Sequence, residues 1–477
     1  MNTNQLYIDG QWMPTSTVKT LDVINPATEE AVLAMACADE ADVDKAVAAA
    51  KAAFPSWSQT PSTERQAILL AIADEMDARV EDLIDAHVMS MGIPRHMALD
   101  WQISGPIEAV RYYAELCHKV DEERAIDGAL IVKEPIGVCS LINPWNYPLL
   151  QMIGKVAPAL AAGCTIICKP AEQTPLSDIV MAEIFDKVGL PKGVFNLVTG
   201  IGAEIGHRLS SHPDVDMVSF TGSTASGIKV AQAAAPTVKR VCQELGGKSP
   251  FIITEGADLE AAVRFGTENV ILMGGQTCDA LTRMFVPRSR YEDAIAIAKS
   301  VAEAQIVGDP LDPNATMGPL ASMIHRDRVV NYIKLGIEEG ARLVTGGPER
   351  PSGRTKGAYV KPTIFADVTA DMRIVREEIF GPVLCILAYD DLEDAIKEAN
   401  DTEFGLSSAV WAKDKSAALK IARRMRAGQC YVQGGNYTIH APFGGYKQSG
   451  NGRAWGEAGL EEYLETKAIV GEGNLSQ

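Results

Sequence analysis

Short apolar runs alternate with amphipathic stretches between residues 140 and 245 of the chain. Apolar positions that recur every three or four residues predict helices, and short apolar runs between turn signals predict strands. The predicted order is helix 151–162, strand 164–168, helix 176–188, strand 194–198, helix 203–210, strand 217–220, helix 224–234 and strand 239–243. Because strands joined through helices usually pair in parallel, this part of the chain predicts an α/β fold built on a parallel sheet.

The same alternation returns between residues 251 and 432 and predicts a second α/β domain. Its expected strands lie at 284–287, 343–345, 384–388, 408–411 and 430–432. Ahead of the first sheet, amphipathic patterns predict two covering helices, at 43–54 and 63–89. A capping box of Thr63 and Gln66 is expected to open the second of them.

Two further segments predict a small β arm. Residues 127–142 contain two strand-like runs around Pro135, Ile136 and Gly137, which we expect to form a hairpin. Residues 460–469 form a strand-like tail near the end of the chain. An extended arm of this kind often joins subunits, so we expect a homodimer or a homotetramer.

The charge of the chain excludes several classes of partner. Its 62 acidic and 44 basic side chains give a formal net charge of −18. This charge would repel phosphate backbones and anionic lipid, so we expect neither a nucleic acid nor a membrane as partner. Nine scattered cysteines lack the paired spacing of metal sites or disulfide frameworks, and the first residues lack the order of a signal peptide. We therefore expect no metal and a cytoplasmic location.

Reactive side chains occur at two places where the chain bends. Cys278 follows Gly274 and Gly275, and glycines allow backbone and substrate to approach closely. Glu244 ends a predicted strand and precedes Gly246 and Gly247, where water could reach it. Taken alone, the cysteine could be a buried core thiol and the glutamate a solvated surface group. Their occurrence together favours a nucleophile and a base.

A proline-framed turn and two glycine patterns are weaker signals. Asn146, between Pro144 and Pro148, offers an amide donor in a rigid turn, although such a turn can serve stability alone. The glycines at 200–206 miss the dinucleotide fingerprint by one residue, and those at 222–227 depart from it further.

Seven motifs together identify a family. In chain order they are Pro-Trp-Asn at 144–146, Lys-Pro-Ala-Glu at 169–172, Phe-Thr-Gly-Ser-Thr at 220–224, Glu-Leu-Gly-Gly at 244–247, Gly-Gln-Thr-Cys at 275–278, Glu-Ile-Phe-Gly-Pro at 378–382 and Pro-Phe-Gly-Gly-Tyr-Lys at 442–447. Over nearly its full length the chain resembles the NAD(P)-dependent aldehyde dehydrogenases. The resemblance implies an NAD-binding domain at 1–118 and 139–246, a catalytic domain at 247–448, and an oligomerisation arm and tail at 119–138 and 449–477.

The resemblance also implies a mechanism for oxidising an aldehyde to an acid. Cys278 would add to the aldehyde, and Glu244 would serve as base for the thiol and for the water that hydrolyses the thioester. The Asn146 amide would stabilise the oxyanion, with Lys155 on a proton path close by.

Further residues are assigned to ligands by the same resemblance. Around the cofactor we expect Trp145, Lys169, Glu172, Gly202, Gly222, Ser223, Glu378 and Phe380. A carboxylate at Glu172 suits a free ribose 2′-hydroxyl, which favours NAD over NADP. The expected aldehyde contacts are Tyr147, Gln151, Tyr437 and Phe443, with Gly154 leaving a roomy entrance. These residues favour an aromatic or medium-chain aldehyde.

Three positions depart from the family pattern: Met273, Gln433 and Ala454. The first two stand where asparagine is common, and Ala454 stands where relatives often carry an acid on the Lys155 proton path. These departures keep two alternatives open beside the hydrolytic enzyme. One is an enzyme that passes the acyl group to coenzyme A, against which Glu244 argues, and the other is a catalytically impaired relative that still binds NAD.

Overall fold

An eight-stranded sheet forms the first of two α/β bodies in the computed structural model, which describes residues 1–471. Its strands run in the order β19-β11-β10-β7-β8-β9-β1-β2. The five strands from β11 to β9 are parallel; β19 joins them antiparallel at one edge, and at the other side β1 joins β9 antiparallel and pairs with the edge strand β2. Their bounds are β1 (Leu6–Ile8), β2 (Gln11–Met13), β7 (Val138–Ile142), β8 (Thr165–Lys169), β9 (Phe195–Leu197), β10 (Met217–Thr221), β11 (Arg240–Glu244) and β19 (Gly450–Asn451). The predicted parallel sheet is confirmed.

Helices cover both faces of this sheet, each with its own apolar cluster. On one face lie α2 (Ser62–Ala78), α3 (Val80–Met91), α5 (Ser104–Leu116), α6 (Pro148–Ala162) and α7 (Leu176–Lys187). On the other lie α1 (Glu40–Trp57), α8 (Gly202–Ser211) and α9 (Thr224–Ala234). Helix α6 begins at Pro148, whose fixed φ suits a first turn, and ends at Gly163 in a left-handed conformation. Its start lies beside the functional site.

A seven-stranded sheet with a separate apolar core forms the second body. Its order is β14-β15-β16-β13-β12-β17-β18, and only β14 runs antiparallel to its neighbour. The strands are β12 (Pro250–Ile253), β13 (Arg283–Pro287), β14 (Arg342–Thr345), β15 (Thr363–Ala366), β16 (Val383–Tyr389), β17 (Ala409–Trp411) and β18 (Tyr431–Val432). The helices are α10 (Leu259–Ile271), α11 (Tyr291–Glu303), α12 (Met323–Glu338), α13 (Arg373–Arg376), α14 (Leu392–Asn400) and α15 (Lys415–Ala422). The second predicted α/β region is confirmed.

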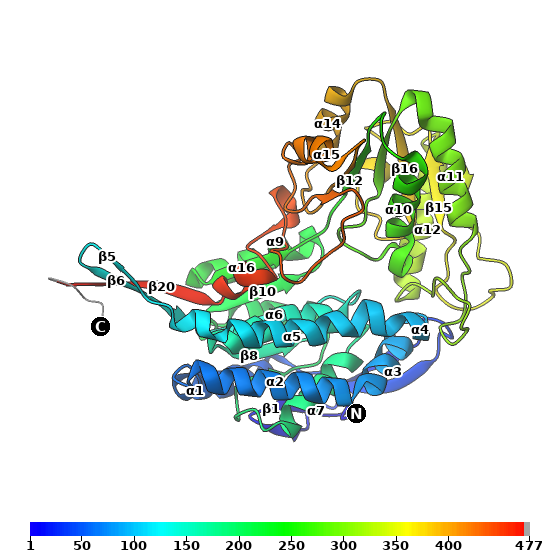
Figure 1. Cartoon of the computed structure of the whole chain (residues 1–477). Helices are drawn as coiled ribbons and strands as arrows, with labels where there is room; N and C mark the ends of the chain where they lie inside the picture. Colours follow the sequence, from blue (N-terminus) through cyan, green and yellow to red (C-terminus); the bar gives the residue numbers. More distant parts are fainter. Residues whose placement is uncertain (472–477) are drawn as a thin grey trace.

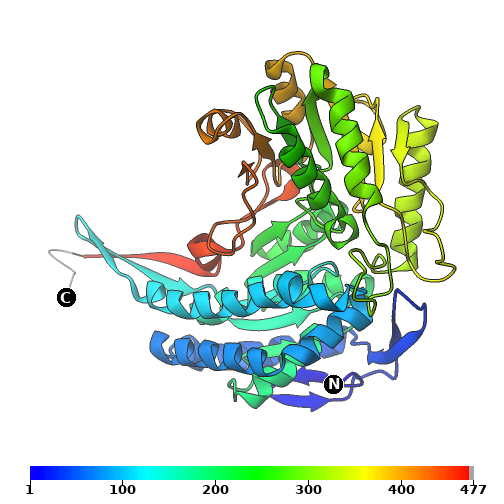
Figure 2. The ribbon, with the colours of Figure 1, turned by 45° about the vertical axis from the view of Figure 1, so that its right-hand side comes forward.

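A narrow arm reaches away from both bodies, as Figures 1 and 2 show. It is a three-stranded sheet of β20 (Leu464–Val470), β6 (Ala129–Pro135) and β5 (Arg124–Ile126), in that order. The remaining α-helices and strands of residues 1–471 are the β3 (Thr20–Ile24) and β4 (Ala31–Ala36) pair, α4 (Arg95–Ala98) and α16 (Gly456–Glu461). Residues 472–477 of the predicted tail lie outside the described residues.

The hairpin predicted at 127–142, with its turn around residues 135–137, is wrong: the turn lies elsewhere. The chain turns at Asp127 and Gly128, both with positive φ, so that β5 pairs with β6. Strand β7 instead enters the eight-stranded sheet, because all five of its residues are buried and only a sheet covered on both faces accommodates them. At the bend between them, Asp216 accepts the backbone N–H of Val138 at 2.8 Å.

The single helix predicted at 63–89 is also wrong, as is its capping box. The helix breaks at Arg79, whose backbone leaves the helical region while its side chain pairs with Asp82 and Glu183. Helix α2 begins at Ser62, and it has no side-chain cap because its N-cap residue is Pro61, which carries no hydrogen-bond acceptor in its side chain. Among residues 1–471, no helix is both long and apolar enough to cross a membrane.

Candidate active site

The candidate site lies where the two sheets face each other. Lys169, Thr221 and Glu244 stand at the carboxyl ends of strands in the first sheet. Gly247 and Cys278 precede β12 and β13, at the amino ends of strands in the second. Carboxyl ends of parallel strands are the usual place for ligands. The fold thus brings together the two reactive residues that the sequence separates by 34 positions.

The bend before Cys278 requires its glycines. Met273, Gly274 and Gly275 have φ values of 54°, 65° and 71°. A Cβ atom at Gly275 would lie 2.1 Å from the backbone carbon of Gly381. Only glycine fits so close an approach with a left-handed φ. The glycines therefore seat the nucleophile loop against the segment that precedes β16.

Two side chains from the start of α6 hold the same loop. The Asn146 side-chain amide donates to the carbonyl of Gln276 at 2.8 Å, and the hydroxyls of Tyr147 and Thr277 are 2.9 Å apart. Asn146 is buried. Its amide therefore lies beside the turn that carries Cys278.

Burial raises the pKa of the Cys278 thiol well above its usual value, and the nearby carboxylates of Asp279, Glu378 and Glu244 raise it further. The side chain is partly exposed, and is one of nine free cysteines. A neutral thiol is a poor nucleophile, so reaction requires a base or a compensating positive charge.

Glu244 is a buried carboxyl group without a hydrogen-bond partner. Neither side-chain oxygen meets a donor among residues 1–471. Burial raises its pKa well above the usual value, against the opposing attraction of Lys155 and Arg453. A raised pKa brings a carboxylate closer to neutral pH, where a general base works best.

Lys155 shares a small cavity with Glu244. Burial lowers the pKa of Lys155 to about 8, although Glu244 opposes the shift. Its ammonium donates to the Gln151 carbonyl at 3.1 Å and to the Gln151 side-chain oxygen at 3.4 Å, and that oxygen also accepts from Thr221 at 3.2 Å. The cavity volume of about 20 Å³ is enough for one water molecule. Gln151, which the resemblance assigns to the aldehyde, also orients Lys155.

The residues expected around the adenine ribose lie together. The Lys169 ammonium is 3.3 Å from a Glu172 carboxylate oxygen and 2.8 Å from the Pro170 carbonyl. A Cβ atom at Gly202, the first residue of α8, would lie 3.7 Å from both charged groups. The lysine is buried and the glutamate partly exposed. Together they offer an exposed acceptor beside a helix N-terminus.

The remaining cofactor candidates divide between the two sheets. Ser223 caps α9 directly after Gly222. Across the gap, Glu378 accepts the Gly247 backbone N–H at 3.0 Å, and the Phe380 ring meets Trp145 edge-on at 5.2 Å. The residues expected near the pyrophosphate and those expected near the nicotinamide ribose thus belong to different sheets, and Trp145 and Phe380 meet between them.

An aromatic group stands where aldehyde contacts were expected. The rings of Tyr437 and Phe443 are 5.9 Å apart, and Trp455 meets Tyr437 at 6.3 Å. The expectation that Gly154 leaves a roomy entrance is wrong. A Cβ atom there would lie 2.6 Å from the Trp455 indole, which already fills the space.

The three departures have local roles. The Met273 carbonyl accepts from the Gln276 side chain at 2.8 Å, and the Gln433 side chain accepts the Ala412 N–H at 2.7 Å. Ala454 exchanges backbone hydrogen bonds with Phe443. Only the Gln433 contact uses a side chain; the contacts of Met273 and Ala454 are made by backbone atoms and do not depend on which residue stands there, and none of the three side chains supplies a charge.

Comparison with known proteins identifies the family. The model described as "Aldehyde dehydrogenase family" matches residues 12–469. The chain belongs to the aldehyde dehydrogenase family. The 3-succinoylsemialdehyde-pyridine dehydrogenase of a Pseudomonas species is 45% identical over 98% of both chains.

Two solved structures of this family are similar throughout. One is a cysteine-to-alanine mutant of Aldehyde Dehydrogenase C from Pseudomonas syringae with NAD+ and octanal, at 47% identity, TM-score 0.97, and 98% and 97% coverage of this chain and that one. The other is an aldehyde dehydrogenase of Mycobacterium tuberculosis with NAD+, at 42% identity, TM-score 0.95 and 98% coverage of both.

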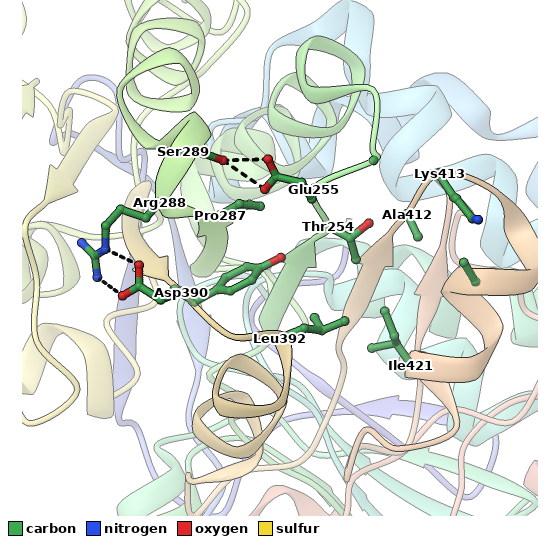
Figure 3. A pocket seen from close by; sticks show the side chains of 13 residues that line it. Thr254, Glu255, Pro287, Arg288, Ser289, Asp390, Leu392, Ala412, Lys413 and Ile421 are labelled. Atoms are coloured by element: carbon green, nitrogen blue, oxygen red, sulfur yellow. Dashed lines mark hydrogen bonds and ion pairs between the residues drawn. The ribbon is translucent and has the colours of Figure 1, made fainter.

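This family member also carries a crevice of about 610 Å³ at the opposite end of its second sheet. Figure 3 shows its rim, where Ser289 binds Glu255 and Arg288 binds Asp390. The crevice opens at the carboxyl ends of β12, β13, β16 and β17, whereas Cys278 precedes the amino end of β13. With its charged rim largely paired and no cysteine or histidine in its lining, it is not the site of aldehyde chemistry.

Sequence reasoning missed several groups that shape this aldehyde dehydrogenase site. Gln276 accepts the Ala321 backbone N–H and so holds the loop that carries Cys278, and Gln102 donates to the Asn146 carbonyl at 3.3 Å. The positive charge of Arg453 opposes the burial that raises the pKa of Glu244. Trp455 is the largest omission. Its position directly after the departure at Ala454 was the one available signal.

Proposed function

We propose that this chain oxidises an aldehyde to the carboxylic acid with NAD, through a thioester on Cys278. The observation that carries the proposal is the convergence of three groups on one buried site. A cysteine in a glycine bend lies beside the Asn146 amide and within electrostatic range of the unpartnered Glu244 carboxyl group. Family membership supports the same chemistry.

In the first half-reaction, Cys278 gives its proton to Glu244, which releases it to water before hydrolysis begins, and the sulfur bonds to the aldehyde carbon. The carbonyl oxygen gains negative charge, which the Asn146 amide and the Cys278 backbone N–H stabilise by hydrogen bonding. Loss of hydride from this carbon leaves a thioester and neutralises the oxygen. NAD would supply the hydride acceptor.

In the second half-reaction, water attacks the thioester carbon while Glu244 takes a proton from that water. The carbon–sulfur bond then breaks, which releases the acid and restores the Cys278 sulfur. Burial raises the pKa of Glu244 well above its usual value, and Lys155, in the same small cavity, opposes that rise by attracting the carboxylate. The pair therefore supports the base that hydrolysis needs.

The cofactor residues fit a dinucleotide with a free ribose hydroxyl. Glu172 is exposed enough to accept hydrogen bonds from the ribose, while Lys169 holds it in place. A 2′-phosphate would be repelled by that carboxylate. Ser223 at the start of α9 suits the pyrophosphate, and Glu378 with Phe380 suits the nicotinamide ribose. Two similar structures contain NAD+, which supports the preference.

The aldehyde is proposed to be aromatic or of medium chain length. Tyr147, Tyr437 and Phe443 offer flat apolar surfaces near the nucleophile loop. The similar structure with octanal and the relative named for a pyridine semialdehyde support these two classes.

The arm and the cysteines support two further proposals. Ile126, Ile469 and Val470 expose apolar surface on the arm, which suits contact with a second subunit in a dimer or tetramer. All nine cysteines are free, which suits the cytoplasm. The two apolar clusters of the first sheet and the separate core of the second suit a division into an NAD-binding domain (1–118 and 139–246) and a catalytic domain (247–448).

The test follows NADH absorbance with NAD and a panel of aliphatic and aromatic aldehydes. Cys278→Ala should abolish NADH formation while NAD still binds, as measured by calorimetry. Cys430→Ala, a change at the other partly exposed cysteine, should keep the activity. If the intact protein forms no NADH with any aldehyde of the panel, the proposal is contradicted. An acyl-coenzyme A product in place of the acid would show transfer instead of hydrolysis.

A further inference from the structure

Trp455 has a backbone conformation that only glycine usually adopts. Its φ is 65° and its ψ is 166°, directly before α16. Side chains rarely occur in this region, because the Cβ atom crowds the neighbouring backbone, and such strain concentrates at functional sites. The side chain is nonetheless almost completely buried, at 2% exposure. The strained backbone places a large ring at one particular point.

That point is the space beside Gly154 on α6. A Cβ atom at Gly154 would lie 2.6 Å and 2.7 Å from two ring carbons of the Trp455 indole. Glycine inside a helix is itself unfavourable relative to alanine. Two individually unfavourable residues, 301 positions apart, therefore fit each other, and the indole replaces any side chain on this face of α6.

The indole lies between the proposed base and the aromatic group. With Glu244 and Lys155 it lines the small cavity behind the site. Its other neighbour is Tyr437, which it meets edge-on, and Tyr437 in turn contacts Phe443. The indole therefore separates the small cavity of Glu244 and Lys155 from the aromatic group of Tyr437 and Phe443.

We propose that Trp455, seated on Gly154, forms the inner wall of the aldehyde pocket and limits the length of the aldehyde that fits. This inference rests on the proposed function of the Cys278 site. Removing the indole opens space into which additional methylene groups can pack, and narrowing the gap at Gly154 pushes the indole toward the substrate. The two positions should therefore change selectivity in opposite directions.

The experiment measures kcat/KM with NAD for straight-chain aldehydes from propanal to decanal. In Trp455→Leu, the ratio of kcat/KM for decanal to that for propanal should rise about tenfold, mainly through a lower KM for decanal. In Gly154→Ala, the same ratio should fall. Combining Trp455→Leu with Gly154→Trp returns an indole from the opposite side and should bring the ratio back toward the original.

Trp57→Leu is the matched control. Trp57 is equally buried at 2% exposure in the same apolar core, but at the end of α1. It should lower the Tm without moving the ratio. If both tryptophan variants leave the ratio unchanged, Trp455 is only a core residue and the inference fails while the proposed function stands. If Trp455→Leu does not fold, Gly154→Ala is the test: a fall in the decanal-to-propanal ratio of kcat/KM supports the inference, and an unchanged ratio contradicts it. Absence of NADH from the intact protein with every aldehyde contradicts the proposed function itself.

Discussion

Replacing Lys155 with methionine tests whether the buried ammonium costs stability, as its environment implies. Burial lowers the pKa of Lys155 in the folded protein to about 8, below the usual lysine value of 10.5. Between these pH values the unfolded chain binds more protons, so this group makes the free energy of unfolding rise with pH. Below about pH 8 the folded state bears the full penalty. At about 1.4 kcal/mol per tenfold change, that penalty is about 3 kcal/mol.

Methionine has a similar length and no charge, so Lys155→Met removes the penalty. The loss of two hydrogen bonds to Gln151 offsets part of the gain, at about 1 kcal/mol each. This offset does not depend on pH. The variant should therefore be more stable than the original chain by about 1 kcal/mol at pH 7, and less stable at pH 10.5.

The assay is calorimetric Tm at both pH values and equal protein concentration. An unfolding entropy of about 2.1 cal/mol/K per residue gives about 1 kcal/mol/K for this chain. The Tm difference between variant and original should then fall by about 3 °C from pH 7 to pH 10.5. Lys248→Met is a second, independent test. Because burial also lowers the pKa of Lys248 to about 8, the Tm difference between this variant and the original chain should fall with pH in the same way. A Tm difference that stays constant with pH would refute the reasoning.

Two other changes have expected outcomes at the proposed site. Asn146→Ala removes an oxyanion donor and should lower kcat by about 10²–10³ while leaving the calorimetric Kd for NAD unchanged; a loss below threefold would remove this role. Glu172→Gln removes the charge that opposes a 2′-phosphate, which at an effective dielectric of 20–40 is worth about 1.5–3 kcal/mol at 5 Å, so KM for NADP should fall about tenfold or more. An unchanged ratio of the KM values for NAD and NADP would place the ribose elsewhere.

The parallel sheets and the motif residues could be predicted because their signals are local. Alternating runs at 164–168 and 217–220 became β8 and β10 within one or two residues. The errors came where distant contacts decide. Helix 63–89 breaks at Arg79, which pairs with Glu183 more than a hundred residues away. The apolar strand β7 looked like half of a hairpin until its partners β8 and β10 were visible.

The pocket shape could not be predicted for the same reason. From the sequence alone, the missing side chain at Gly154 suggests empty space. Trp455 fills that space only because residues 450–455 return to the first sheet. Three segments surround the Glu244 carboxyl group, which has no hydrogen-bond partner among residues 1–471: β11, α6 and the chain around Arg453. Residue types named the chemistry, but the surroundings that tune it are assembled from the whole chain.

The missing acid at Ala454 need not stop proton movement in this site. Burial raises the pKa of Glu244 and lowers that of Lys155, so the two values move toward each other. A carboxyl group and an amine with close pKa values exchange a proton at little free-energy cost. The cavity they share has room for about one water molecule, and Gln151, which also lines it, holds the ammonium by hydrogen bonding. Because the proton released in hydrolysis can pass between Glu244 and Lys155, we expect Lys155→Met to raise the Glu244 pKa and move the acidic limb of the kcat profile to higher pH. A profile that does not move would show that Glu244 works without its neighbour.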